Sequence, residues 1–305
     1  MTVTKRQNSN VKNPYDAIIE PINVRLGALR DKSITISKDS SQFRRIQSNP
    51  SRHTMLFGTD GKDGTAIAYH VPAQLTNFEN LTMRLTELIK TLPRLPPWKL
   101  KKNLESQKCI ANSRVYTCWT SFQEDQKPHM SSQYIVDGEE AKNFIKECAP
   151  LWKKSGEILQ VVFRKTYKIY TNYPLPDGLT HLAEAWMGMA VNEGCKEDPV
   201  VSDKHQDRND AFYGVSCVCA FGDYEGGDLI CWELKVIVEL KPGDMFFFPA
   251  HLITHSNTEV KGERHSLVAF TQQKVLNWFG QRYNCVDDRD IARGIKRQKK
   301  TVDNM

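Results

Sequence analysis

The first half of the chain carries apolar residues at helical spacing. Between residues 81 and 92, leucines recur every three or four positions, which predicts an amphipathic helix over 77–91. Thr76 and Glu79 have the spacing of a capping box, in which two side chains satisfy the first backbone N–H groups of a helix. Two further stretches, 139–147 and 150–170, repeat the helical spacing. The pattern therefore predicts a helical first half.

After about residue 180, the apolar residues come in short runs separated by turns. Gly226-Gly227 and the 241–244 sequence Lys-Pro-Gly-Asp are strong turn signals. Many short strands with evenly spaced turns are typical of a β-sandwich or barrel. The whole pattern predicts an α+β fold in which a β-rich core, about 180–275, packs against N-terminal helices. The expected strands are 65–69, 114–122, 186–192, 214–221, 229–234, 236–240, 245–249 and 266–271.

The two ends of the chain lack this periodicity and are basic. Residues 1–60 hold ten Lys and Arg against five Asp and Glu. We predict a basic, flexible arm over 1–55, a folded domain over 56–280 and a basic tail over 281–305. The cluster at 296–300 is typical of a nuclear import signal or a nucleic-acid contact, and equally of a solvated tail. We expect a nuclear location, with a cytoplasmic one as the alternative.

Composition narrows the class of protein. The 305 residues carry a formal charge of +6, and 40% hydrophobic with 26% charged residues is ordinary for a globular protein. No apolar run reaches the roughly 18 residues of a membrane helix, and the polar N-terminus lacks the apolar core of a signal peptide. None of the eight cysteines forms a C-x-x-C pair. We therefore expect free thiols in a reducing compartment, and neither a membrane contact nor a zinc ribbon.

The main chemical signal is His205-x-Asp207. On an extended segment, residues two positions apart face the same side, so one metal ion can accept both side chains. A third ligand must come from another strand, and His251, His255 and His265 are the downstream candidates. Two histidines and one carboxylate on one face of a metal suit the non-haem Fe(II) oxygenases. An ordinary polar pair is the alternative, because such a short sequence is a weak signal by itself.

Arg264 and Ser266 strengthen the metal interpretation. A guanidinium group grips a carboxylate at two points, and a hydroxyl on the same face of the strand adds a donor. A dicarboxylate co-substrate needs such an anchor at its far end while its keto-acid end chelates iron. A surface ion pair is the alternative for Arg264, but the apolar run 267–270 argues against a fully solvated arginine.

The motifs between residues 203 and 273 closely resemble those of the Fe(II)/2-oxoglutarate dioxygenases, which share a double-stranded β-helix (jelly-roll) fold. More narrowly, they resemble the TET/JBP branch as found in fungal genomes, a family of 5-methylcytosine dioxygenases. The resemblance covers about residues 140–280, and residues 1–130 have no recognisable counterpart. The motifs that carry it are His205-x-Asp207, 221–229 (FGDYEGGDL), 241–244 (KPGD), Phe248-Pro249, 255–257 (HSN) and 262–266 (GERHS).

This resemblance implies a specific set of metal ligands. His205, Asp207 and His255 would bind Fe(II), with 2-oxoglutarate and O2 as co-substrates. His251 then becomes a neighbour of the site. His265 points to the opposite face of its strand from Arg264 and is expected to be a packed or surface histidine.

The resemblance also implies a 2-oxoglutarate anchor. Arg264, helped by Ser266, would hold the distal carboxylate, and Asn192 would face the same pocket. The step from His255 to Arg264 is one residue shorter than the commonest spacing, which keeps Lys261 as a second candidate for the carboxylate.

TET/JBP enzymes oxidise a methyl group on a pyrimidine base in DNA, so the resemblance implies a DNA partner and a base flipped into the pocket. Asp210 is the candidate for reading that base, because a carboxylate accepts from the exocyclic amine of cytosine or adenine. Gln272 is a second candidate, and Phe212 or Tyr213 could stack on a base. The alternatives are structural polar residues and core aromatics. The Cys/His clusters of the animal enzymes have no match here, so we expect no zinc site.

Three hypotheses about function follow. The leading one is an Fe(II)/2-oxoglutarate dioxygenase that converts 5-methylcytosine in DNA to 5-hydroxymethylcytosine and further oxidised forms, with N6-methyladenine demethylation as an alternative. The second keeps the chemistry and changes the substrate to a protein side chain or a small metabolite. The third is a non-catalytic binding module, against which the four matched groups His205, Asp207, His255 and Arg264 argue. We expect a monomer.

Overall fold

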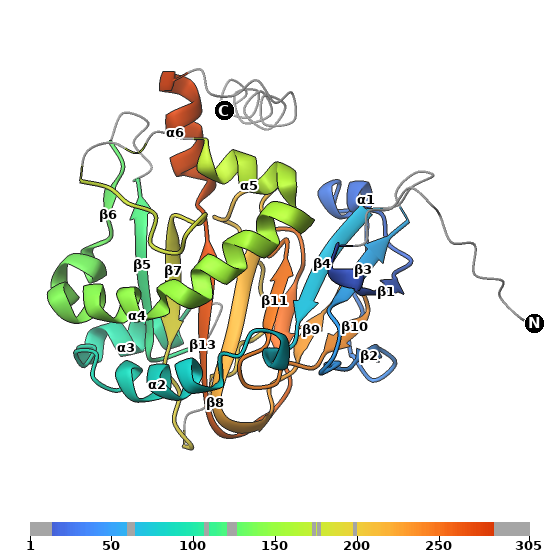
Figure 1. The fold of residues 1–305 in the computed structure, drawn as a ribbon, viewed down its shortest axis with the longest axis horizontal. Coiled ribbons are helices and arrows are strands. Elements are labelled where there is room, and N and C mark those ends of the chain that lie inside the picture. Colours follow the sequence, from blue (N-terminus) through green and yellow to red (C-terminus); the bar gives the residue numbers. More distant parts are fainter. Residues whose placement is uncertain are drawn as a thin grey trace, which may run out of the picture.

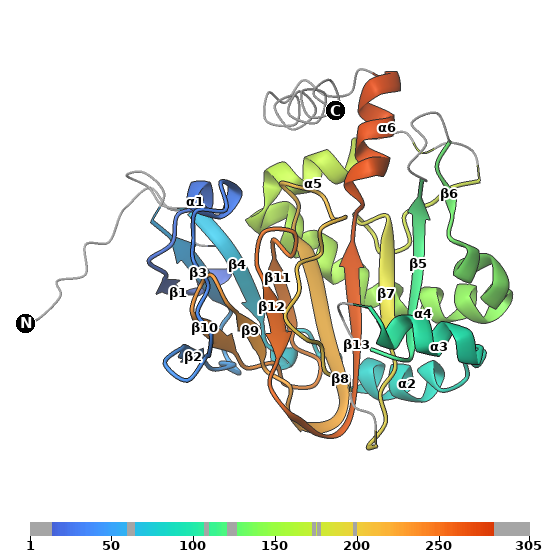
Figure 2. The same cartoon turned by 180° about the vertical axis from the view of Figure 1, so that it is seen from behind.

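The computed structural model describes residues 14–59, 65–106, 110–120, 127–172, 175, 178–197 and 200–283. Figures 1 and 2 show the molecule from opposite sides. The predictions for residues 1–13 and for the basic cluster at 296–300 lie outside the described residues. None of the helices in the described ranges has the length and hydrophobicity needed to cross a lipid bilayer.

Two β-sheets form the centre of the described structure (Figure 2). The larger sheet has nine strands in the order β1-β3-β4-β11-β8-β13-β7-β5-β6, and the smaller has four in the order β12-β9-β10-β2. This arrangement confirms the expected α+β class. The β-rich part extends beyond the expected 180–275, because five of the nine strands of the larger sheet lie before residue 180. The strands are β1 (Ile18–Pro21), β2 (Arg44–Ile46), β3 (Thr54–Gly58), β4 (Thr65–Val71), β5 (Ser113–Trp119), β6 (His129–Met130), β7 (Gly188–Asn192), β8 (Ser216–Gly226), β9 (Leu229–Cys231), β10 (Val236–Val238), β11 (Met245–Phe248), β12 (His255–Asn257) and β13 (Val260–Phe270).

Alternating side chains give the larger sheet two apolar faces. On β8, Val218 packs toward the smaller sheet with Leu229 of β9, whereas Cys217 and Cys219 pack toward the helices. Both faces of the central strands are therefore buried, which explains why their sequences read as nearly continuous apolar runs. The two sheets pack face to face through the apolar core that contains Val218 and Leu229, as in a jelly roll.

Helices cover the outer face of the larger sheet (Figure 1). Leu85 of α2, Trp152 of α4 and Phe279 of α6 are fully buried or nearly so in the core against this face. The helices are α1 (Leu26–Arg30), α2 (Glu79–Ile89), α3 (Pro97–Leu104), α4 (Ser132–Val162), α5 (Arg164–Thr171) and α6 (Gln273–Tyr283), with 3-10 turns at Pro14–Asp16 and Ala73–Leu75.

Two details of the helical half differ from the prediction. The two stretches expected as 139–147 and 150–170 are divided elsewhere. α4 runs through Pro150 to Val162 and so joins 139–147 to the first part of 150–170, and the remainder of 150–170 forms the separate helix α5. Proline lacks the N–H group that would continue the helical hydrogen bonds. Packing of the buried residues Leu151 and Trp152 stabilises the helix at this position. Thr76 does not cap α2, because its hydroxyl donates to the carbonyl of Ala73 and the N-cap residue is Phe78.

The expected flexible arm over 1–55 is wrong for its described part, residues 14–55. β1 pairs in parallel with β3, and β2 pairs in parallel with β10 of the smaller sheet. Leu29 and Ile46 are buried in the core between the sheets. Strands of three or four residues at sheet edges are too short to show a periodicity, so their structure depends on partners far away in the sequence.

The turn predicted at Gly226 and Gly227 forms a corner between the two sheets. β8 ends at Gly226 in the larger sheet, and β9 begins at Leu229 in the smaller one. Both glycines have φ values near +70°, a region that favours glycine. The chain crosses here from one wall of the jelly roll to the other.

Candidate active site

His205, Asp207 and His255 converge on one point at the edge of the smaller sheet. One ligand atom from each of the three residues lies within 4.8 Å of the others. Asp207 Oδ1 is 3.8 Å from His205 Nε2, and Asp207 Oδ2 is 3.9 Å from His255 Nε2. We call this cluster the metal side of the site. Its atoms are separated as ligands around a shared ion are, rather than as partners in a direct hydrogen bond.

Local backbone pairing brings the two histidines together. His205 N donates to the carbonyl of His255 at 3.0 Å, and His255 N donates back to the carbonyl of His205 at 2.9 Å. Asp207 N donates to the carbonyl of Ala250, which ties the second half of the motif to the loop before β12. The side chains of His205 and Asp207 then reach the same side, as an extended i, i+2 pair does.

Both histidines are held with Nε2 toward the cluster. His205 Nδ1 lies 2.7 Å from the carbonyl of Asp203, and His255 Nδ1 lies 2.9 Å from the carbonyl of Ile253. Because a carbonyl only accepts, each Nδ1 carries the proton and each Nε2 keeps a lone pair. Hydrogen bonds of this kind fix the tautomer and the ring orientation of metal-binding histidines.

Arg264 lies on the opposite wall of the same cavity, in the middle of β13. The cavity has a volume of about 50 Å³ and is lined from both sheets, by His205, Asp207 and His255 on one side and by Asn192, Arg264 and Ser266 on the other. We call Arg264, Ser266 and Asn192 the anion side. Arg264 and Ser266 face the cavity together because they are two positions apart on one strand.

The guanidinium of Arg264 has an unused donor. Arg264 is 1% exposed; its Nη1 donates to the carbonyl of Val200 at 3.0 Å, whereas the buried Nε has no hydrogen-bond partner. Burial lowers the pKa of Arg264, although an arginine remains protonated in proteins. A buried cation with an unsatisfied N–H is costly unless an anion meets it. The site therefore fits a ligand carboxylate.

Gly227 makes room for this arginine. A Cβ atom at Gly227 would lie 2.7 Å from both Cδ and Nε of Arg264. The ring of Tyr224 lies nearby, with its centroid 5.5 Å from Arg264 Cζ. Gly227 thus serves the site as well as the corner between the sheets, because a side chain here would displace the guanidinium.

Asn192 and Ser266 connect the anion side to its neighbouring strands. Asn192 Nδ2 donates to Ser266 Oγ at 3.0 Å, and Asn192 Oδ1 accepts from Ser113 Oγ at 2.7 Å. Ser266 is paired in register with Asn192 of β7. Asn192 therefore orients the hydroxyl that lies beside Arg264.

The other candidates of this region lie elsewhere. Lys261 is exposed and does not line the cavity, which leaves Arg264 as the cation there. His265 points to the opposite face of β13, where its Nδ1 accepts from Gly194 N at 3.2 Å and its Nε2 lies 3.0 Å from Glu263 Oε1. His251 packs its ring against Phe212, with centroids 4.6 Å apart. Burial lowers the pKa of both histidines.

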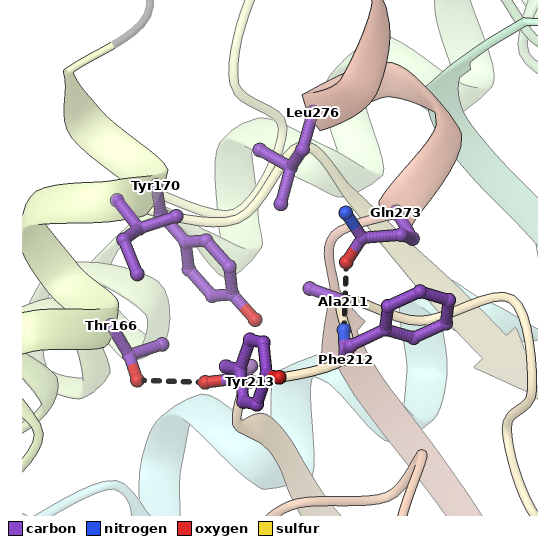
Figure 3. A pocket seen from close by; sticks show the side chains of 9 residues that line it. Thr166, Tyr170, Ala211, Phe212, Tyr213, Gln273 and Leu276 are labelled. Carbon is purple, nitrogen blue, oxygen red and sulfur yellow. Dashed lines mark hydrogen bonds between the residues drawn. The ribbon is translucent and has the colours of Figure 1, made fainter. Parts of the chain in front are cut away.

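The residues expected to read a base do not line the cavity. Asp210 and Gln272 form a backbone bridge with each other, and Asp210 Oδ2 accepts from Ser216 Oγ at 2.8 Å. This geometry favours the structural alternative for both. Tyr213 lines a separate small pocket beside Tyr170 of α5 (Figure 3). A larger cavity of about 350 Å³ lies next to it, where the guanidinium of Arg30 stands 4.4 Å from the centre of the Tyr213 ring.

Ser202 and Asn257 also line the cavity and were not singled out from the sequence. Ser202 Oγ donates to Asn257 Oδ1 at 2.8 Å, and Asn257 Nδ2 donates to the carbonyl of Gly227 at 3.2 Å. Asn257 follows His255 by two positions, so strand alternation could have placed it on the same face. Ser202 carries no such signal, because it lies in an irregular segment before the H-x-D motif.

The donor set fits Fe(II) and 2-oxoglutarate. Two imidazole nitrogens and one carboxylate form the facial set of non-haem iron oxygenases. The unsatisfied guanidinium on the facing wall suits the far carboxylate of a dicarboxylate co-substrate. The residues that the structure brings together are thus those that this chemistry requires.

Comparisons with known proteins agree with this geometry. The Tet_JBP family model, described as the oxygenase domain of the 2OGFeDO superfamily, matches residues 114–273, just over half of the chain. The structure of NgTET1 in complex with 5mC DNA aligns with a TM-score of 0.56 at 15% identity, covering 77% of this chain and 84% of that one. At this identity, the likeness shows the shared fold.

Two other solved structures align at lower TM-scores. An oxidoreductase of the 2OG-Fe(II) oxygenase family from Burkholderia pseudomallei aligns with a TM-score of 0.43 at 14% identity, covering 67% of this chain and 84% of that one. OsALKBH1 aligns with a TM-score of 0.39 at 13% identity, covering 67% and 96%. A search of curated protein sequences found no significant match. From the family match, together with the double-stranded β-helix and its His-Asp-His cluster, the chain belongs to the Tet_JBP family and is a 2-oxoglutarate-dependent dioxygenase that uses Fe(II) and O2.

Proposed function

We propose that His205, Asp207 and His255 hold Fe(II), and that Arg264 and Ser266 bind the far carboxylate of 2-oxoglutarate. The observation that carries this assignment is the single cavity that all five side chains line. When bound, the iron supplies the oxidising power of the reaction with 2-oxoglutarate and O2. The protein positions the metal and the co-substrate and excludes bulk water from them.

Each part of the chain has a defined task in this scheme. The carbonyls of Asp203 and Ile253 keep Nδ1 of the two histidines protonated, so their Nε2 atoms stay available to the metal. Arg264 orients the co-substrate by a two-point contact, and Asn192 holds the Ser266 hydroxyl beside it. The apolar core between the sheets excludes bulk water, which strengthens these polar contacts.

We propose further that the substrate is 5-methylcytosine in DNA, converted to 5-hydroxymethylcytosine and further oxidised forms. Two observations support a DNA substrate. NgTET1, which shares the fold, is in complex with 5mC DNA. An open pocket next to His205 is lined by the exposed cations Lys204 and Arg208, with one exposed carboxylate, Asp203; the two cations suit contacts to phosphates. A methylated base would have to leave the duplex to reach the metal side. We also propose a monomeric protein with a nuclear location.

The test is an incubation of the protein, loaded anaerobically with Fe(II) and 2-oxoglutarate, with duplex DNA on exposure to O2. Three duplexes of one sequence would carry 5-methylcytosine, N6-methyladenine or no methyl group. Mass spectrometry of the released nucleosides should show loss of 5-methylcytosine and gain of 5-hydroxymethylcytosine. Loss of N6-methyladenine alone would replace the proposed base. Unchanged nucleosides in all three duplexes would contradict a DNA methyl substrate.

A further inference from the structure

The residues that flank the two histidines of the metal side meet one short turn. Along an extended segment, neighbours of a residue point away from it. The neighbours of His205 and His255 do so, and both sets reach Trp232 and Glu233, which follow β9. We infer that Trp232 and Glu233 are positioning residues, which set the separation of the two histidine-bearing segments. This inference rests on the proposed metal ligands.

Glu233 binds the residue that precedes His255 and the residue that follows His205. Its Oε2 accepts from Thr254 N at 2.7 Å, and its Oε1 accepts from Thr254 Oγ1 at 2.7 Å. The same Oε1 accepts a longer bond, 3.5 Å, from Gln206 Nε2. Thr254 directly precedes His255, and Gln206 lies between His205 and Asp207. One buried carboxylate therefore links both ligand segments.

Trp232 contacts the residue that follows His255 and the residue that precedes His205. Its Nε1 donates to Ser256 Oγ at 3.0 Å, and the Lys204 ammonium lies 3.2 Å from the centre of its indole ring. Its backbone N–H also donates to the carbonyl of Thr254 at 2.9 Å. Ser256 follows His255, and Lys204 precedes His205. Trp232 and Glu233 thus hold both flanks of both histidines.

The backbone ladder that joins these segments is short, and β12 pairs with β9 over three residues only. β12 spans His255–Asn257, and His205 joins it through an isolated bridge rather than a strand. A ladder this short fixes register weakly, so side-chain contacts must contribute to it. Partners that hydrogen-bond metal ligands directly change metal affinity about 10- to 100-fold when they are removed. Glu233 and Trp232 act through the residues next to the ligands, so we expect effects toward the lower end of that range.

Glu239 provides a matched control. It follows β10 in the chain, and its Oε2 accepts from a backbone N–H, that of Ser48, at 2.8 Å. The contact joins Glu239 to the segment after β2, not to either histidine segment. A general loss of stability from a removed carboxylate should therefore be shared by Glu233→Ala and Glu239→Ala, whereas a loss of metal affinity should be confined to Glu233→Ala.

The experiment is a titration of the metal-free full-length protein with Co(II), followed by its visible absorption, with the thermal midpoint measured on the same samples. Glu233→Ala should raise the Co(II) dissociation constant at least about tenfold, and Glu233→Gln should raise it less because one acceptor oxygen remains. Trp232→Phe, which removes one hydrogen bond, should raise it about threefold. Glu239→Ala should leave it unchanged.

An unchanged dissociation constant in folded Glu233→Ala, or an equal rise in Glu239→Ala, would overturn the inference. If Glu233→Ala does not fold, Glu233→Gln and Trp232→Phe decide by the same criterion. Asp207→Ala separates this inference from the proposed function. Co(II) binding that survives Asp207→Ala would overturn the metal assignment itself. If Asp207→Ala loses Co(II) binding while the Glu233 and Trp232 variants bind Co(II) as the wild type does, only the positioning role is overturned.

Discussion

The metal side and the anion side of the cavity are built in different ways. Arg264 lies within a strand of eleven residues, β13, that is paired with β8 on one side and with β7 on the other. His255 lies in a strand of three residues, and His205 joins it through one isolated bridge. The anion side is therefore held by a backbone ladder, whereas the metal side depends on side-chain and loop contacts.

This difference has a consequence for how each side responds to change. A long ladder keeps its register when one side chain is altered, because many backbone bonds share the load. A short bridge is among the elements that open locally at low free energy. We expect substitutions near the metal side to disturb ligand geometry, and those near the anion side to change ligand affinity while the strand stays in place.

Removal of a metal ligand should give the largest effect. Asp207→Ala should lower the turnover of 2-oxoglutarate by about a thousandfold, because the metal contributes several kcal/mol to catalysis. The measurement is succinate release, together with Co(II) binding. Asp223→Ala is the matched control, since Asp223 is an exposed carboxylate on β8 outside the cavity. Equal losses in both variants would break the assignment of the metal side.

Loss of the buried guanidinium should come next. Arg264→Leu should weaken 2-oxoglutarate binding about a hundredfold, since removing one partner of a buried charge pair costs about 2–5 kcal/mol. Arg264→Lys should recover part of the affinity, because the charge remains without the two-point geometry. Binding of 2-oxoglutarate to the Co(II) protein, followed by calorimetry, measures this.

Lys261→Ala is the control for the anion side, because Lys261 is exposed on the same strand. It should leave 2-oxoglutarate binding unchanged. A loss of affinity in Lys261→Ala that matches Arg264→Leu would restore Lys261 as the carboxylate partner.

A smaller effect is expected at the corner between the sheets. Gly227→Ala places a Cβ 2.7 Å from Arg264 Nε at a positive φ of 69°. We expect a loss of about 1–3 kcal/mol in unfolding free energy from backbone strain, with weaker 2-oxoglutarate binding. Gly27→Ala, in α1, where a new Cβ meets nothing within 4 Å, is the control. It should leave binding unchanged and should not lower the unfolding free energy, because alanine favours a helix over glycine by about 0.5–1 kcal/mol. Normal 2-oxoglutarate affinity in Gly227→Ala would show that the corner does not determine the position of Arg264.

The smallest effect concerns pH. Burial lowers the pKa of His265, against the opposite influence of the Glu263 carboxylate, which is itself paired with Lys90 at 2.9 Å. The unfolded chain titrates near 6.5. Stability from the neutral ring is therefore complete above about pH 6.5 and is lost as pH falls from there toward the lower folded pKa.

His265→Asn should remove part of that loss. Urea unfolding at pH 7.5 and pH 5 should show a smaller drop in the variant than in the wild type. Identical drops would mean that β13 tolerates a charged His265, contrary to its buried position behind Arg264.

Much of the site could be predicted because its signals are local. Spacing of two residues placed His205 with Asp207 and Arg264 with Ser266, and alternation placed His265 on the other face. Asp210 and Gln272 were suggested by the family resemblance rather than by such local spacing. The structure pairs their backbones with each other, and the Asp210 carboxylate accepts from Ser216. Nothing in a linear pattern reports such contacts.

The sequence by itself determined the chemistry of this protein: two imidazoles, a carboxylate and a guanidinium at spacings that suit iron and a dicarboxylate. The tertiary structure decided where these groups meet. It recruited residues 14–55 into both sheets, turned Gly226-Gly227 into the corner beside Arg264, and set Trp232 and Glu233 against both histidine segments. The physical reason is the separation in sequence of the residues that set each property. Side-chain direction along a strand is fixed by neighbours in the chain, whereas the distance between strands is fixed by packing between residues far apart in the sequence.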